Sequence, residues 1–180
     1  MANINPGIYT PYSFPQCVQT SADARVVYTF TQFGNANRNS GGSLNIKELN
    51  TTITPRLSTS KIMISVSLSY DQIYAGAWYL IRRVGGVATE IGSAPPSGDN
   101  RPYGFACAMW HNPGNNIIPY NACRSFLDTP NTTSPVTYEL WVYNGNSSDT
   151  FFVLNGCFTD TNLAHNWRGT SQMILQEFFV

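Results

Sequence analysis

The residues of this chain that could perform chemistry are two histidines, ten carboxylates and four cysteines. A hydrolytic centre needs a nucleophile, a base beside it and a third group that orients the base. His111 and His165 are the two histidines, and the nucleophile pattern G-x-S-x-G does not occur in the sequence. Because His111 follows Trp110 and precedes Asn112-Pro113, we interpret it as a structural histidine in a loop. The sequence therefore predicts no catalytic residue of this kind.

The carboxylates form no recognisable pair for acid–base work on a glycosidic bond, which requires two acids facing one cleft. We expect Asp128 and Asp160 to hold turns through side-chain to backbone hydrogen bonds. The fragment Thr159-Asp160-Thr161-Asn162 lacks the glycine and the terminal glutamate of a calcium-binding EF-hand loop. Glycine patterns that bind nucleotides are also missing. We predict no metal, no cofactor and no enzymatic activity.

The four cysteines do not form a zinc pattern, since no two of them have the C-x₂₋₄-C spacing. An even number permits two disulfides, with three possible pairings. The first residues, Met1 to Pro6, have neither the basic nor the apolar region of a secretion signal. We therefore expect a product made in a cytoplasm, where most cysteines are buried and reduced. The cysteines are Cys17, Cys107, Cys123 and Cys157.

The composition is polar but almost uncharged. Charged residues make up 11% of the chain and the formal net charge is +0, against about 25% charged residues in ordinary domains. Nucleic-acid binding requires clustered basic residues, and here they are scattered, so this class is excluded. No apolar run reaches the length of a membrane span. A surface of neutral amides and hydroxyls fits a protein that packs against copies of itself or contacts sugars.

Tryptophans are the available platforms for sugar contact. Trp78 and Trp141 lie within predicted strands, where a core role is expected. Trp110 and Trp167 lie at strand ends or in loops, which favours the surface. We therefore name Trp110, His111 and Trp167 as candidate surface or glycan contacts.

The dominant pattern is an alternation of apolar and polar residues with period two, which indicates half-buried strands. It is clearest over Lys61–Tyr70 and continues over Ala77–Val84. Gly85-Gly86 then separates Ala77–Val84 from Val87–Ile91, which predicts a tight hairpin. No segment has a convincing helical period. The further predicted strands are 25–33, 44–48, 104–110, 122–127, 136–143, 150–155 and 171–179. Many short strands separated by turns predict an all-β antiparallel sandwich or barrel.

Residues 1–24 differ from the rest because they contain prolines and aromatics without alternation. Either they form a disordered tail or they form an extended arm. An arm would dock Tyr9, Tyr12 and Phe14 on a neighbouring subunit, since these aromatics would otherwise stay in water. The predicted organisation is an N-terminal arm, 1–24, followed by a sandwich domain, 25–180.

The C-terminal half carries three distinctive stretches. They are Phe126-Leu127-Asp128-Thr129-Pro130 with Val136-Thr137-Tyr138, then Phe152-Val153-Leu154-Asn155-Gly156, then Trp167-Arg168-Gly169-Thr170-Ser171 with Met173-Ile174-Leu175. With the earlier strands from Lys61 and the turn Arg101-Pro102-Tyr103-Gly104, they resemble β-sandwich domains of phage virion proteins, including those of cyanophages.

The resemblance implies a jelly-roll-like sandwich, usually homotrimeric, found on tail fibres, head fibres or capsid decorations. The expected function is that of a bacteriophage structural protein, a small decoration or spike that acts by self-assembly and docking on other virion proteins. The alternative is the receptor- or glycan-binding head of a tail fibre, with a host surface glycan as partner. Synthesis in the host cytoplasm and residence in the virion follow from either interpretation.

Overall fold

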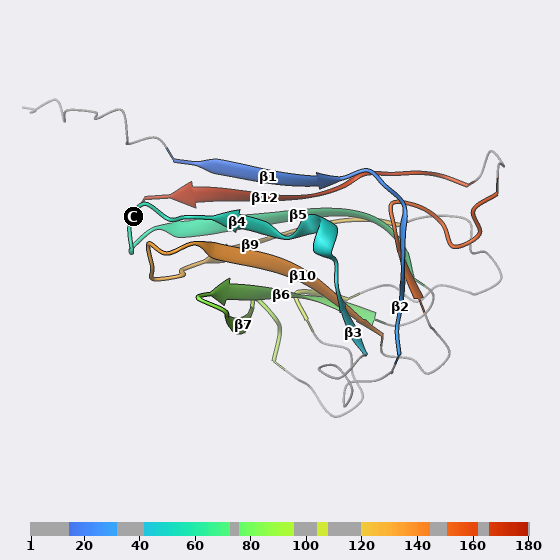
Figure 1. Ribbon diagram of the computed structural model, residues 1–180, viewed down its shortest axis with the longest axis horizontal. Coiled ribbons are helices and arrows are strands. Elements are labelled where there is room, and N and C mark those ends of the chain that lie inside the picture. Colours follow the sequence, from blue (N-terminus) through green and yellow to red (C-terminus); the bar gives the residue numbers. More distant parts are fainter. Residues whose placement is uncertain are drawn as a thin grey trace, which may run out of the picture.

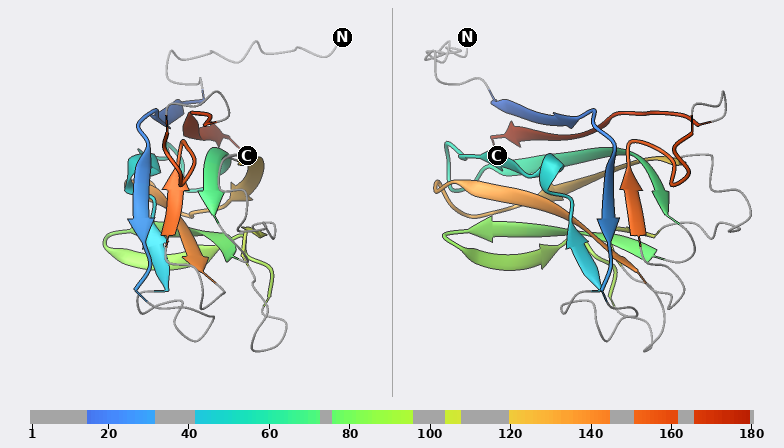
Figure 2. Two further views of the ribbon diagram at one scale, coloured as in Figure 1. Left: turned by 90° about the vertical axis from the view of Figure 1, so that its right-hand side faces the viewer. Right: turned by 45° about the vertical axis from the view of Figure 1, so that its right-hand side comes forward.

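The computed structural model describes residues 15–31, 42–72, 76–95, 104–107, 120–144, 151–161 and 166–179. In this part of the chain almost all regular structure is strand, arranged in two antiparallel sheets of six strands each. The sheets pack face to face, with β1 and β12 on one side of the molecule and β6 and β7 on the other (Figures 1 and 2). The predicted all-β antiparallel sandwich is confirmed.

The first sheet is built around β5, its longest strand. One side of β5 pairs with β9, while the other pairs first with β12 and then, near its end, with β11. β1 borders β12 and β2 borders β11. The six strands are β1 (Cys17–Ala22), β2 (Val26–Thr29), β5 (Lys61–Gln72), β9 (Tyr120–Asp128), β11 (Phe151–Leu154) and β12 (Ser171–Phe178).

The second sheet is built around β10 in the same way. β6 pairs along one side of β10, and β4 and β3 share the other side. β7 and β8 pair with β6. The elements are β3 (Ser43–Asn45), the 3₁₀ turn η2 (Lys47–Leu49), β4 (Thr51–Ile53), β6 (Gly76–Val84), β7 (Val87–Ile91), β8 (Ala106–Cys107) and β10 (Val136–Asn144).

The strand order is that of a jelly roll. We count β3 and β4 as one strand and treat β2, β8 and β11 as extensions, which leaves eight principal strands in chain order. If these eight strands are numbered in chain order, neighbouring strands in the first sheet are numbers 1, 8, 3 and 6. Neighbouring strands in the second sheet are numbers 2, 7, 4 and 5. This order interleaves two Greek keys, in which each sheet alternates early and late strands. The predicted jelly-roll-like topology is confirmed.

The core lies between the sheets and follows the predicted alternation. Ile62, Ile64, Val66, Leu68 and Tyr70 of β5 are all buried. They face a matching row from the second sheet, whose members are Val136, Tyr138, Leu140 and Val142. Such pairing of two apolar faces supplies most of the driving force for folding a sandwich.

Aromatic side chains fill one end of this core. Trp78 is buried, as predicted, and its ring lies edge-on to Tyr70 with centroids 4.8 Å apart. Tyr70 in turn stacks on Phe152 at 5.6 Å. Both arrangements are favoured by the ring quadrupole.

The hairpin between β6 and β7 has the geometry that its sequence predicts. Gly85 and Gly86 have φ angles of 55° and 86°, in the region that glycine adopts without steric cost. Two consecutive positive φ values are characteristic of the type I′ turn, which matches the twist of paired strands.

Strand β1 lies outside the predicted strands. The sequence places Cys17–Ala22 in the N-terminal arm, but these residues form β1, which pairs with β12 over six residues. Its alternation is weak because the inward positions are Val18, Thr20 and Ala22, of which only Val18 is a large apolar residue. This part of the predicted arm thus belongs to the sandwich. Tyr9, Tyr12 and Phe14 lie outside the described residues.

Two further local predictions needed revision. The strand predicted over 44–48 divides into β3 and η2, and the three-residue strand β4 was missed. β4 is too short for an alternation to be read from sequence. Its partner is fixed by register, with Ile53 opposite Val136 and Thr51 opposite Tyr138.

Candidate interaction surface

The outer face of the first sheet, which we call the neutral face, carries three uncharged rows of side chains, and the row next to them holds Lys61, paired with Phe178. Side chains of β1, β12, β5 and β9 alternate between the core and this face. The strand registers align the outward residues in three rows of four across the sheet. None of these side chains carries a charge. The rows are Cys17–Gln176–Met63–Leu127, Gln19–Ile174–Ser65–Ser125 and Ser21–Gln172–Ser67–Cys123.

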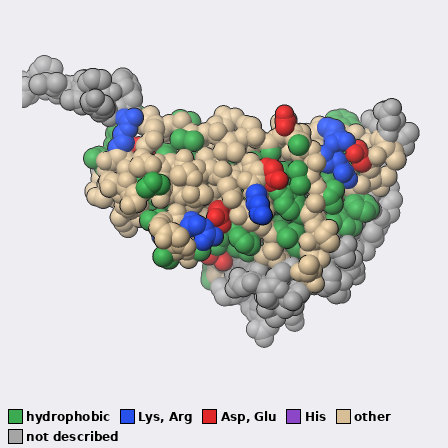
Figure 3. Space-filling model, viewed as in Figure 1, with side chains coloured by type: hydrophobic (Ala, Val, Ile, Leu, Met, Phe, Trp, Pro, Cys, Tyr) green, Lys and Arg blue, Asp and Glu red, His purple; other side chains and the backbone are tan. Residues whose placement is uncertain are grey.

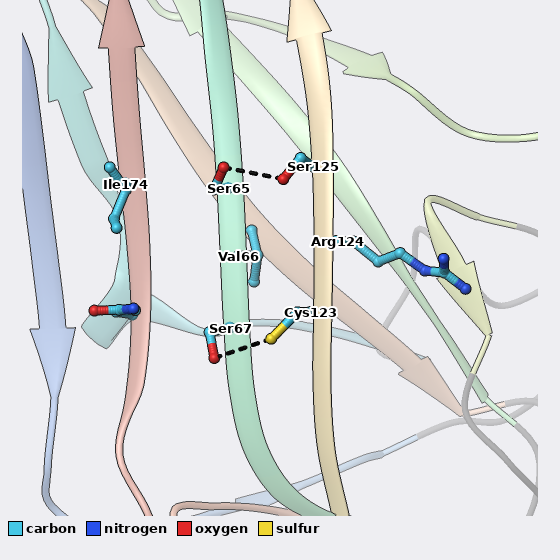
Figure 4. Close-up of a pocket in the computed structure, with 8 residues that line it drawn as sticks. Ser65, Val66, Ser67, Cys123, Arg124, Ser125 and Ile174 are labelled. Atoms are coloured by element: carbon cyan, nitrogen blue, oxygen red, sulfur yellow. Dashed lines mark hydrogen bonds between the residues drawn. The ribbon is translucent and has the colours of Figure 1, made fainter.

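A shallow hollow of about 230 Å³ lies within this face (Figure 4). Ser65 and Ser125 lie across it from each other, with their hydroxyl oxygens 3.0 Å apart. The thiol of Cys123 donates to the Ser67 hydroxyl at 3.4 Å. Arg124, on the rim, points away from the hollow in Figure 4. The hollow therefore contains small neutral groups that partly satisfy one another.

The chemistry of this face suits contact with another macromolecule better than catalysis. Removing a charged side chain from water is costly, and interface centres are depleted of charged residues for that reason. Hydroxyl and amide groups cost less to desolvate and can exchange hydrogen bonds with a partner. The area formed by these three rows can be covered without burying a charged side chain.

A second exposed feature lies at the end of the molecule where β2 and β11 run. Trp167 is 65% exposed and Phe158 is 40% exposed. Phe151 stacks on Phe158 with ring centroids 3.8 Å apart. We call Trp167, Phe158 and Phe151 the aromatic end. Figure 3 shows basic and acidic side chains together at this end, beside hydrophobic side chains.

The charged groups near the aromatic end form a small network. Arg168 donates to both carboxylate oxygens of Asp160, at 2.8 and 2.7 Å. Arg25 lies 3.8 Å from the same carboxylate and donates to the carbonyls of Cys157 and Phe158. These contacts fix the loop that carries Phe158. The prediction that Asp160 holds its turn through backbone bonds is wrong, because its partners are the side chains of Arg168, eight residues further on, and of Arg25, which is far away in the chain.

The candidate contact residues have different outcomes. Trp167 is described and exposed, and its carbonyl accepts a hydrogen bond from the Cys157 thiol at 3.7 Å. Trp110 and His111 lie outside the described residues. Phe158 and Phe151 were not singled out from the sequence. The only indication in the sequence that these two rings are exposed is their position beside polar loops. This arrangement is common in exposed and buried segments alike.

Asp128 also differs from expectation. It accepts two hydrogen bonds from Arg82, at 2.9 and 3.1 Å, and one from the Tyr138 hydroxyl at 2.8 Å. Arg82 and Tyr138 belong to the second sheet and Asp128 to the first, so the carboxylate joins the two layers. Burial raises the pKa of Tyr138, and the nearby Asp128 charge raises it further. Asp128 is therefore a clamp between sheets and not a turn-holding residue.

Two further acids are buried with specific partners. The guanidinium of Arg83 donates to Glu139 at 2.8 and 3.1 Å, and this contact lowers the pKa of Glu139. Burial pushes the pKa of Glu177 upward. Hydrogen bonds from its neighbours, among them the Arg56 amide at 2.7 Å and the Gln16 side chain at 2.9 Å, outweigh burial and lower the pKa. Both acids thus stay ionised in structural roles.

Two motif residues of the C-terminal half, Asn155 and Ser171, are buried and meet where the ends of β1 and β11 approach the start of β12. Asn155, at φ 59°, donates from its side chain to the carbonyls of Ala22 and Ala24 at 2.9 and 3.0 Å. Ser171 donates to the Asn155 side-chain oxygen at 2.6 Å. The Asn155-Gly156 and Arg168-Gly169-Thr170-Ser171 stretches are therefore structural elements of the fold.

The prediction that most cysteines are buried is wrong, because two of the three cysteines whose side chains the structure describes are exposed. Cys17 and Cys123 are exposed with free thiols, and Cys157 is buried. Both exposed cysteines sit at outward positions of the neutral face, on β1 and β9. The spacing of the cysteines in the sequence does not reveal their exposure, because strand pairing decides which side of each strand faces outward.

Among the described residues, no three His, Cys, Asp or Glu side chains are grouped so as to hold a metal ion. Within that same part of the chain, no helix has the length and apolar character needed to cross a membrane.

Neither a family model nor a curated protein sequence matches this chain. Similar solved structures include that of the infectious bursal disease virus VP2 subviral particle, with 12% identity and a TM-score of 0.46, covering 99% of this chain and 36% of that chain. The structure of the Gt strain of infectious bursal disease virus is similar over 93% of this chain and 38% of that chain, with 10% identity and a TM-score of 0.44. This chain therefore spans little more than a third of either. We assign the jelly roll from the strand order of this chain.

Proposed function

We propose that this protein is a structural component of a virus particle, a bacteriophage decoration or spike that acts by assembling and docking. The observation that carries the proposal is the set of three uncharged rows on the neutral face, which extend from Cys17 to Cys123. The jelly-roll order of the strands and the phage-like motifs of the C-terminal half support it. The proposed role involves no catalysis.

In this proposal the neutral face and the N-terminal arm have separate tasks. The face covers a flat surface on another virion protein or on a second copy. The arm, with Tyr9, Tyr12 and Phe14, anchors the protein on its neighbour. Homotrimeric assembly is part of the proposal and comes from the resemblance to phage virion domains.

The proposal is tested by incorporation into particles. Ser125→Lys places a charge at the edge of the hollow, and we expect it to lower the number of copies per particle at least tenfold because the lysine must be desolvated on docking. Thr89→Lys, on the exposed strand β7, is the matched control and keeps the wild-type copy number. Quantitative mass spectrometry of purified particles measures both. Absence of the wild-type protein from particles would overturn the proposal.

A second function is favoured by the aromatic end. Trp167 and Phe158 offer exposed rings next to arginine and carboxylate groups, a combination that can stack on a sugar and hydrogen-bond its hydroxyls. This supports a glycan- or receptor-binding head. In a glycan array, Trp167→Ala is expected to abolish binding, while Phe178→Ala, which removes another exposed aromatic at 40% exposure, keeps it. A wild-type protein that binds no glycan would remove this alternative.

A further inference from the structure

Strand β1 is an open edge of the first sheet. It pairs on one side with β12 along its full length, from Cys17 opposite Gln176 to Ala22 opposite Ser171. The sheet order begins at β1, so no described strand lies on its other side. Figure 1 shows β1 at the border of the sheet, beside β12.

The backbone groups that point to this open side can be assigned. The Glu177 amide donates to the Gln16 carbonyl at 2.9 Å, so Gln16 is a hydrogen-bonded position toward β12. Hydrogen-bonded and non-bonded positions alternate along an antiparallel strand. Therefore Cys17, Gln19 and Ser21 direct their N–H and C=O groups away from β12.

The composition of β1 lacks the features that normally keep edges apart. Proteins protect edge strands with charges, prolines, bulges or short length. Cys17–Ala22 contains no charge and no proline, and it pairs with β12 without a bulge. The other long edge strands carry charge: β7 has Glu90, and β9 has Arg124 and Asp128. The remaining edge strands in the described part of the chain have four residues or fewer.

We propose that β1 pairs with β1 of a second copy of this chain, antiparallel and about a two-fold axis. A two-fold contact brings identical surfaces together, so a charge at the centre of the edge would meet a like charge. β1 is neutral throughout, which makes the edge compatible with its own copy. The pairing joins the neutral faces of two copies into one continuous surface.

The geometry selects the register of this pairing. Hydrogen-bonded residues must face each other, so Gln19 lies opposite Gln19 of the second copy and Cys17 lies opposite Ser21 of the second copy. This register uses all three outward positions and forms about six backbone hydrogen bonds. A register centred on Thr20 would use two positions and form about four. The Gln19-centred pairing is therefore preferred.

The inference concerns self-association and does not depend on a particular position in a virion. A two-fold edge contact uses a different surface from a three-fold contact, so both can exist in one assembly. A trimer without edge pairing would leave the proposed function standing and remove only this inference. A protein that pairs through β1 but never enters particles would support this inference and overturn the proposed function.

Disulfide trapping tests the register. In a Cys17→Ser background, Gln19→Cys is expected to give a dimer crosslinked through the two introduced thiols under mild oxidation, because facing Cα atoms about 5.5 Å apart suit a disulfide. Native Cys123 on β9 serves as an internal reporter, since it lies on the same face at the opposite edge. Mass spectrometry identifies the crosslinked pair. A crosslink between the introduced thiol and Cys123 would mean head-to-tail pairing, and no crosslink would mean no edge contact; either result overturns the proposal.

Charge exchange gives an independent test in solution. Gln19→Lys and Gln19→Glu are each expected to weaken the dimer at least tenfold, because like charges then face each other. An equimolar mixture of the two is expected to restore it. Thr89→Lys, on the exposed strand β7 of the second sheet, is the control and leaves the dimer intact. Sedimentation velocity resolves the 19.9 kDa monomer from a species of twice that mass, and failure of the mixture to restore association contradicts the proposal.

Discussion

The Ser171 hydroxyl donates a hydrogen bond to the side-chain oxygen of Asn155 over 2.6 Å, inside the junction where the ends of β1 and β11 approach the start of β12. Asn155 uses its amide nitrogen to bind the carbonyls of Ala22 and Ala24. Its own backbone amide donates to the Ser69 carbonyl at 2.8 Å. One buried side chain thereby connects the end of β1, the end of β11 and the start of β12. Four testable consequences for stability follow from this junction and from two other buried polar contacts.

Replacing Asn155 is expected to be among the most destabilising single changes. Asn155→Ala leaves two carbonyls without their donor and places an alanine at φ 59°, with an expected loss of about 3–5 kcal/mol. Asn155→Gly keeps the backbone conformation accessible and loses only the side-chain bonds, so we expect about half that loss. Urea unfolding measures both. Equal losses would mean that the positive φ contributes nothing.

Gly169 is required by close approach of Ser69. A Cβ at residue 169 would overlap the Ser69 hydroxyl and lie 2.5 Å from its Cβ. Gly169→Ala is expected to cost about 2–4 kcal/mol through this overlap. Ser69→Gly removes the atoms in the way, so the double variant is expected to recover most of the loss relative to Ser69→Gly alone. Thermodynamic coupling below about 0.5 kcal/mol in this double-mutant cycle would contradict the steric explanation.

The clamp between the sheets predicts a graded effect. Tyr138→Phe removes one hydrogen bond to the Asp128 carboxylate, and we expect a loss of about 1.5–3 kcal/mol. Arg82→Met leaves that carboxylate without its cation at a site where it is 7% exposed, so a larger loss of about 3–5 kcal/mol is expected. Thr89→Ala on exposed β7 is the control and stays within about 0.5 kcal/mol. The order of the two losses in chemical unfolding checks the assignment.

Glu177 predicts a specific pH dependence. Its pKa in the folded protein lies below the ordinary value of 4.5, so the folded state favours the ionised form. Its contribution is present above pH 4.5 and is lost as the pH falls through the folded-state pKa. Glu177→Gln is expected to be less stable by about 1–3 kcal/mol at pH 7, because hydrogen bonds to a charged acceptor are lost. The gap from wild type should close in acid.

The control for this prediction is Glu90→Gln, which changes an acid on exposed β7. Stability curves from about pH 2 to about pH 8 are compared for the three proteins. A gap between wild type and Glu177→Gln that stays constant down to the acid end of this range would show that ionisation of Glu177 does not stabilise the fold.

Local patterns predicted much of the sandwich because strand alternation is visible in neighbouring residues. β5, β10 and the β6–β7 hairpin were predicted close to their observed bounds. β1 escaped detection, since its inward side includes Thr20 and Ala22 and the strand is recognised only through its pairing with β12.

The candidate surface depended more on tertiary structure. Exposure of Trp167 was anticipated, whereas its neighbours Phe158 and Phe151 were not. The three uncharged rows of the neutral face combine residues from four strands that are far apart in the chain. The low charge of the whole sequence indicated that the protein would have an uncharged surface. The location of this surface could be found only from the registers of β1, β12, β5 and β9.

By itself, the sequence determined that the chain would be all-β, lightly charged and formed of strands with one apolar face, because these properties depend on residue type and on period two. Only the tertiary structure decided which distant residues meet. Arg82, Asp128 and Tyr138 come together through the packing of two sheets, and Asn155, Ser69 and Ser171 through strand pairing within one. The physical reason is that register and layer packing place side chains by the pairing of whole strands, and that pairing is not contained in any local stretch.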